Sequence, residues 1–227
     1  MEFGTSQFWI AAMEIIVINI LLSGDNAVVI ALACRNLPPK QRKLGIFWGV
    51  IGAVVLRIIL TFFAVSLLKL PYLQLIGAAL LLWIGVKLIA EDDEGSHDVH
   101  AHDRLFAAVK TVIVADLVMS LDNVIGVAGA AKGSLVLLTF GLVVSIPLVV
   151  VGSQLIMKLI ERAPILVMVG GGLLGFLAGE IAIADTAVKP WIDANATQLH
   201  VIAPIAGIVI VVGLGWWLSR RGKGVGV

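Results

Sequence analysis

Long apolar stretches dominate this chain, and they constrain its fold more than any other feature. A helix needs about 20 apolar residues to cross a bilayer, and about seven stretches approach or exceed that length. Their approximate bounds are Phe8–Ala33, Leu44–Leu68, Tyr72–Ala90, Leu105–Ala131, Leu135–Ile160, Ile165–Ala184 and His200–Ser219. The strands of a membrane barrel would alternate apolar and polar residues, whereas these stretches are continuously apolar. The sequence therefore predicts an all-α, polytopic membrane helix bundle of about seven transmembrane helices.

The composition agrees with a lipid environment and argues against several classes of function. Hydrophobic residues make up 60% of the chain and charged residues only 14%, which is more apolar than a soluble domain. A net charge of +1 gives no field for capturing nucleic acid. Cys34 is the single cysteine, so no intramolecular disulfide or multi-cysteine metal site can form. The lipid bilayer is the expected partner, nucleic acid is not, and a homo-oligomer stays open.

The basic residues between the apolar stretches predict an orientation. Every second connection is rich in them, whereas Lys69, Lys132 and Lys189 each stand alone in the connections between. The basic connections and the C-terminal end contain Arg35, Lys40, Arg42, Lys43, Arg104, Lys158, Arg162, Arg220, Arg221 and Lys223. Cytoplasmic loops carry the excess of Lys and Arg. The chain is thus expected to be a multi-pass cell-membrane protein with an extracytoplasmic N-terminus and a cytoplasmic C-terminus.

An internal repeat relates the two halves of the chain. The first apolar stretch aligns with the fourth without gaps, and the third aligns with the sixth. The matched pairs are Asn19 with Asp116, Ser23 with Ser120, Asp25 with Asp122, Asn26 with Asn123, Pro71 with Pro164, Gly77 with Gly170 and Lys87 with Glu180. Because each repeat holds three spans, the second enters the membrane from the opposite side, as in many secondary transporters.

This repeat predicts four regions. Residues 1–90 form the first three-helix repeat, and residues 104–185 form the second, inverted repeat. Between them, residues 91–103 form a cytoplasmic loop rich in carboxylates and histidines, which is either a solvated linker or a weak metal-capturing segment. Residues 186–227 contain an extracytoplasmic loop, an appended seventh helix and a basic cytoplasmic tail.

Paired carboxylates inside the apolar stretches are the strongest functional signal. Asp25 and Asp122 lie well inside their spans, where an ionised carboxylate is costly unless it is compensated. A divalent cation shared by the two aspartates, with the amide oxygens of Asn26 and Asn123 nearby, would supply that compensation. An oxygen-only ligand set suits hard ions such as Mn²⁺, Mg²⁺ or Ca²⁺. We therefore expect a metal site made of Asp25, Asn26, Asp122 and Asn123.

Other polar residues within or beside the spans are candidates for an outer shell or an ion pathway. These are Asn19, Asp116, Glu180, Asp185, Glu14, Ser23, Ser120 and Arg57. Arg57 is the one deep cation, and buried charges are usually paired. An ion pair between Arg57 and one of the carboxylates is therefore expected, and it would give that acid a structural role.

The two Asp-Asn segments, Ser23-Gly24-Asp25-Asn26-Ala27 and Ser120-Leu121-Asp122-Asn123-Val124, resemble those of the TerC family. The likeness covers essentially the whole chain and is strongest to the short bacterial branch with seven spans. The family takes its name from tellurium resistance and is associated with Mn²⁺ export. The resemblance implies that these aspartates and asparagines bind a transported ion.

The leading hypothesis is a secondary transporter that exports a divalent metal ion, with Mn²⁺ as the first candidate, by alternating access and with proton exchange at the same carboxylates. Mn²⁺ is then substrate, and no organic cofactor is expected. Export of a small organic cation or amino acid is one alternative, and a non-transporting metal sensor or scaffold is another. An enzyme is not expected, because the serines have no intramembrane histidine as base. Metal selectivity, transport direction, counter-ion and oligomeric state are not determined by the residues.

Overall fold

The computed structural model describes residues 9–10, 13, 16–17, 24–67, 70–90, 101–130 and 135–222, without some of their side chains, those of residues 122–130 among them. Every extended regular element in these ranges is helical. The helices are α2 (Gly24–Cys34), α3 (Pro39–Leu67), α4 (Leu73–Ala90), α5 (Ala101–Ala130), α6 (Leu135–Arg162), α7 (Ile165–Ala184), α8 (Lys189–Asn195) and α9 (Leu199–Gly222). The predicted all-α class is confirmed for this part of the chain.

Five helices of the described residues are long and apolar enough to cross a membrane. They are the segments Pro39–Thr61, Leu73–Ala90, Leu142–Arg162, Ile165–Ala184 and Leu199–Arg221. The two remaining predicted spans differ from these. Within Phe8–Ala33 the structure describes a continuous helix only from Gly24, in the 11-residue α2. The 30-residue α5 carries charged residues along its length.

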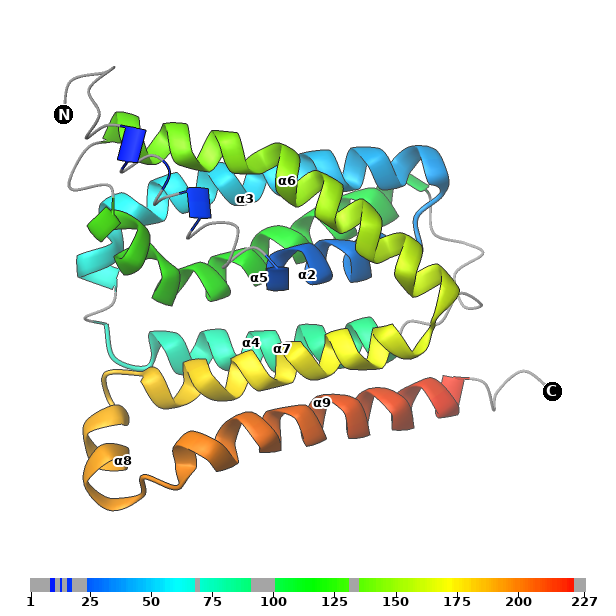
Figure 1. The fold of residues 1–227 in the computed structure, drawn as a ribbon. Helices are drawn as coiled ribbons and strands as arrows, with labels where there is room; N and C mark the ends of the chain where they lie inside the picture. Colours follow the sequence, from blue (N-terminus) through cyan, green and yellow to red (C-terminus); the bar gives the residue numbers. More distant parts are fainter. Residues whose placement is uncertain are drawn as a thin grey trace.

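The helices form two layers (Figure 1). In one layer, α4, α7 and α9 pack against one another. In the other layer, α2, α3, α5 and α6 pack together, with α5 lying along α3 and α2 lying against α6. The long α6 crosses its layer obliquely and leads directly into α7. Contacts of α4 with α5 and of α2 with α7 join the two layers.

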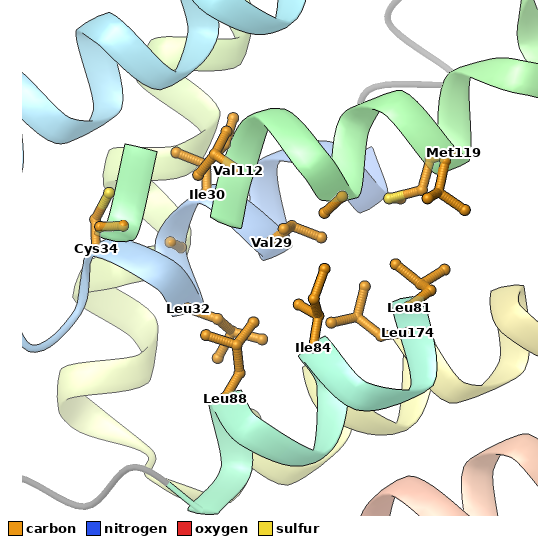
Figure 2. Close-up of a cluster of buried hydrophobic side chains, with 14 of the residues drawn as sticks. Val29, Ile30, Leu32, Cys34, Leu81, Ile84, Leu88, Val112, Met119 and Leu174 are labelled. Carbon is orange, nitrogen blue, oxygen red and sulfur yellow. The ribbon is translucent and has the colours of Figure 1, made fainter. Parts of the chain in front are cut away.

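The main core lies between these layers (Figure 2). Val29 and Leu32 of α2 face Ile84 and Leu88 of α4 across it, and Met119 of α5 closes one side. All of these side chains are buried. Burial of large apolar residues between the layers holds α2 in place even though this described helix is short.

The outer faces of the bundle carry large apolar side chains. Trp83 of α4, Val169 of α7 and Val209 of α9 are 61%, 61% and 65% exposed. A soluble protein rarely exposes large contiguous apolar surface, whereas lipid tails are its natural neighbours in a bilayer. The exposed faces are therefore those expected of a membrane protein.

Helices α7 and α9 approach each other more closely than side chains would allow. A Cβ added to Gly175 or Gly207 would overlap the backbone of the other glycine, and a Cβ on Gly179 would overlap the backbone of Ala203. Small residues that let helix backbones touch are a common basis of helix association in membranes. The helix that the sequence predicts as an appendage is thus packed tightly onto the layer.

The connection between α7 and α9 contains the short helix α8, which the sequence analysis does not predict. Its Pro190 stands in the first turn, where the missing N–H costs nothing. Asp193 of α8 contacts the ring of His200 at 2.8 Å. The predicted loop after residue 185 is therefore partly helical.

Candidate functional site

A buried ion pair lies between α3 and α5, within the layer that contains α2 and α6. The Nη2 of Arg57 donates to Oδ1 of Asp116 at 2.5 Å, and its Nε donates to the Ser120 hydroxyl at 3.0 Å. Ser120 in turn donates to Oδ2 of Asp116 at 3.1 Å. Arg57 and Asp116 are each 5% exposed, and Ser120 is fully buried. The ion pair expected of Arg57 is present, and its partner is Asp116.

The spacing of the residues on α5 explains this triangle. Asp116 and Ser120 are four residues apart and therefore lie on one face of the helix. Arg57 reaches both of them from α3, which lies along α5. Its planar guanidinium can donate in two directions at once, so a single side chain serves the carboxylate and the hydroxyl.

A small cavity of about 30 Å³ adjoins this ion pair. Its polar lining consists of Arg57, Asp116 and Asn26, which come from α3, α5 and α2. Leu142, Ile146 and Val149 of α6 are among its apolar lining residues. A cavity of this size has room for a water molecule or a bare ion, and it lies where helices from both halves of the chain meet.

Asp25 lies beside this region, in the first turn of α2. Its Oδ1 accepts the backbone N–H of Asn26 at 2.7 Å, a donor that the first turn of a helix leaves available. Asp25 directly precedes Asn26, which lines the cavity together with Arg57 and Asp116. Asp25 is partly buried and Asn26 is buried. The first half of the predicted metal site is thus placed next to the ion pair and the cavity.

The second half of the predicted metal site is only partly described. Asp122 and Asn123 belong to α5, two and three residues beyond Ser120, but their side chains lie outside the described positions. Asn19, Ser23 and Glu14 lie outside the described residues altogether. Among the side chains that the structure does place, no three His, Cys, Asp or Glu residues form a group that could hold a metal ion. The four-residue metal site therefore stays a prediction.

Asp185 and Glu180 lie at the C-terminal end of α7, and neither is among the residues that line the cavity. Glu180 is exposed on α7, whereas Asp185 is completely buried at the C-terminal end of that helix. The carboxylate of Asp185 accepts backbone N–H groups from Tyr72 at 3.0 Å, Gln74 at 3.0 Å, Leu75 at 3.3 Å and Ala187 at 2.8 Å. Asp185 thus caps the start of α4 from a distant part of the chain.

The hydrogen bonds of Asp185 favour its ionised form. Burial disfavours the ionised form, but the backbone donors of Ala187, Tyr72, Leu75 and Gln74 outweigh it and hold the pKa of this carboxyl below its usual value. Tyr72 has a φ of 67°, in the left-handed region that non-glycine residues rarely adopt. The cap therefore holds a strained residue at the start of α4.

Sequence reasoning misses two features of this arrangement. The apolar cavity wall on α6 carries no signal, because Leu142, Ile146 and Val149 look like any other residues of a span. The cap by Asp185 is also missed, since three of its four donors are backbone groups more than 100 positions away along the chain. The available sign was an aspartate in a short connection directly after an apolar stretch, a place where aspartate side chains commonly accept backbone N–H groups.

Comparison with known proteins adds a family. The model of the integral membrane protein TerC family matches residues 4–223. The uncharacterized membrane protein YjbE of Bacillus subtilis is 40% identical over 206 residues, which are 91% of this chain and 94% of YjbE. The uncharacterized membrane protein YceF of the same organism is 29% identical, over 89% of this chain and 81% of YceF. No solved structure matches this chain.

Proposed function

The chain belongs to the TerC family of integral membrane proteins, and on that premise we propose that it is a secondary transporter that exports a divalent metal ion, with Mn²⁺ as substrate. The observation that carries the proposal is the buried Arg57–Asp116 pair beside Asn26 and a cavity of about 30 Å³. Ionisable residues inside a membrane bundle are expensive, and they commonly mark ion pathways.

The helix contacts support an inverted repeat as the framework of this transporter. Helix α2 packs on α6 in the way that α5 packs on α3, and α2 contacts α7 as α5 contacts α4. Helices α4 and α7 pair with each other. Two three-helix repeats related by a two-fold axis in the membrane plane would produce this pattern, with α2 and α5 belonging to the first and fourth of seven spans.

In this proposal Asp116 has a different role from Asp25 and Asp122. Arg57 neutralises Asp116, so that pair adds no net charge to the region. Asp25 and Asp122 would then carry the negative charge that binds the cation, with the amide oxygens of Asn26 and Asn123 as further hard ligands. Protonation of the two aspartates on the opposite side of the membrane would release the ion and return protons in exchange.

The size of the cavity favours an ion over the organic cation or amino acid considered as an alternative. A volume of about 30 Å³ accepts a single water or a bare ion. Sites for organic ligands are about ten times larger or more. A non-transporting metal sensor with the same residues is distinguished by metal binding in the absence of flux.

The test is uptake of radioactive Mn²⁺ into proteoliposomes with an imposed pH gradient. We expect Asp25→Asn and Asp122→Asn each to reduce the flux to the level of empty vesicles, because each removes a charge from the cation site. Asp193→Asn is the matched control, since this aspartate is exposed on α8; its flux should equal that of the wild type. Flux by folded protein that is indifferent to both substitutions would refute the proposed site, and binding without flux would favour a sensor.

A further inference from the structure

An open apolar groove runs along the outer face of the α7 and α9 layer, away from the ion pair. It has a volume of about 680 Å³ and is lined by six residues of α7 between Ile165 and Phe176 and by Ile208 and Val212 of α9. None of its lining residues is charged. Its volume falls within the usual range of about 300–1,000 Å³ for sites that hold an organic ligand.

The length and position of the groove fit one leaflet of a bilayer. From Ile165 to Phe176 the helix rises about 17 Å at 1.5 Å per residue, which is close to half of a hydrocarbon core of about 30 Å. Ile165 is the first residue of α7, so the groove begins at one end of the bundle. The rim residues Ile165 and Val169 are 62% and 61% exposed, and the groove therefore opens toward lipid.

Arginines are concentrated at that same end. The α6–α7 turn, which follows Arg162, lies at the same end of the molecule as the C-terminal end of α9 (Figure 1). There Arg220 stacks on the Trp216 ring at 3.8 Å and Arg221 stacks on the Trp217 ring at 3.7 Å. Tryptophan and basic residues of this kind gather at the level of lipid headgroups. Glu161, which precedes Arg162, is itself paired with Arg42. At the far end of α9, the helix α8 carries both Lys189 and Asp193.

From this combination we propose that the groove binds an acyl chain of an anionic phospholipid, whose phosphate group lies against Arg220, Arg221 and Arg162. The apolar lining supplies the site for the chain, and the arginines select a negatively charged headgroup. Stacking on Trp216 and Trp217 holds two of the arginines beside their helix, which reduces the freedom they lose when they bind phosphate. In the proposed orientation the lipid belongs to the cytoplasmic leaflet.

The experiment is native mass spectrometry of the full chain released from a mild detergent. Phosphatidylglycerol and phosphatidylcholine with identical acyl chains are titrated separately. We expect the wild type to prefer phosphatidylglycerol, and Arg220→Gln/Arg221→Gln to weaken binding of that lipid about thirty-fold with little effect on phosphatidylcholine. Lys40→Gln/Lys43→Gln, which removes two exposed charges from the start of α3, is the matched control and should retain the preference.

Groove-filling variants test the chain site independently of charge. Leu173→Trp fills the groove and should reduce binding of both lipids, whereas Leu155→Trp, at an exposed position on α6, should not. Val169→Phe at the exposed rim is the milder second variant, in case Leu173→Trp lowers thermal stability. Equal lipid binding by wild type and both filling variants would overturn the proposal. A dimer that the filling variants abolish would also overturn it, since the groove would then hold a second copy of the chain.

Discussion

In the layer of α4, α7 and α9 the helices meet through glycines, whereas between α3 and α5 the buried contact includes Arg57 and Asp116. Within the described residues, the buried polar groups of the first layer are Gln74 and Asp185, and both lie at its end. Two backbones in van der Waals contact form a fixed interface. A charged pair next to a cavity can instead exchange its hydrogen bonds with water or an ion. We therefore expect the first layer to act as a rigid scaffold, and the proposed ion site lies in the second layer.

The largest effect should come from breaking the ion pair in the second layer. Arg57→Met leaves the Asp116 carboxylate buried without its cation, and we expect it to lower the free energy of unfolding by about 3–5 kcal/mol. Denaturant unfolding of the purified protein measures this value. Arg57→Met/Asp116→Leu removes both charges and should restore part of the loss. If the double variant is as unstable as the sum of the two single variants, the pair is not coupled as described.

A smaller loss should follow from adding one methyl group to the first layer. Gly207→Ala places a Cβ against the carbonyl of Gly175, so α9 must move away from α7 at a cost of up to about 3 kcal/mol. The control is Gly213→Ala on the same helix, where a Cβ meets nothing within 4 Å and stability should be retained. Equal thermal unfolding of the two variants would show that the close approach contributes nothing.

The smallest effect concerns Asp185, at the end of the first layer opposite the arginines, and depends on pH. Asp185→Asn weakens the cap of α4 and should cost about 1 kcal/mol at neutral pH. The pKa of Asp185 is lowered in the folded protein; its ionised form therefore contributes stability above the unfolded value of about 3.9, and this contribution is lost as the pH falls further toward the folded pKa. The stability difference between variant and wild type should thus shrink below about pH 4, as thermal unfolding across pH can measure. A difference independent of pH would contradict the assignment of this cap to the charged form.

The sequence predicts the helices well where apolar length alone decides them. The stretch Ile165–Ala184 coincides with α7, and Tyr72–Ala90 differs from α4 by one residue. Helix α3 begins at Pro39 rather than near Leu44, because its first turn is charged and leaves the apolar region while staying helical. The length of an apolar stretch indicates how much of a helix lies in lipid. The helix itself can extend further, as long as its backbone hydrogen bonds continue.

The site is less predictable, because the sequence pattern does not show which charged side chains lie close together in the folded protein. Arg57 lies deep within an apolar stretch, so it is expected to pair with a carboxylate. Several acidic residues could have been that partner, and only the packing of α3 along α5 shows that it is Asp116. The neutral Asn19, which aligns with Asp116, needs no cation, and the stretch that corresponds to α3 in the second half has no basic residue before Lys158. The two repeats are thus alike in their Asp-Asn segments and different in how their neighbouring polar residues are balanced.

The touching backbones of α7 and α9 have a consequence for motion. Glycines recur at every fourth position of α7 in Gly171, Gly175 and Gly179, yet the residue one turn beyond Gly207 on α9 is Val211. Sliding α9 by a turn would bring the branched side chain of Val211 to where Gly207 now meets Gly175. Sliding it the other way would bring Ala203 there, and even a single Cβ at that place overlaps the Gly175 backbone. A one-turn ratchet between packed helices, known from other proteins, is therefore blocked here. We therefore expect the two helices to keep one register and to move as a unit, so that in the proposed transport cycle any reorientation falls to the helices around them.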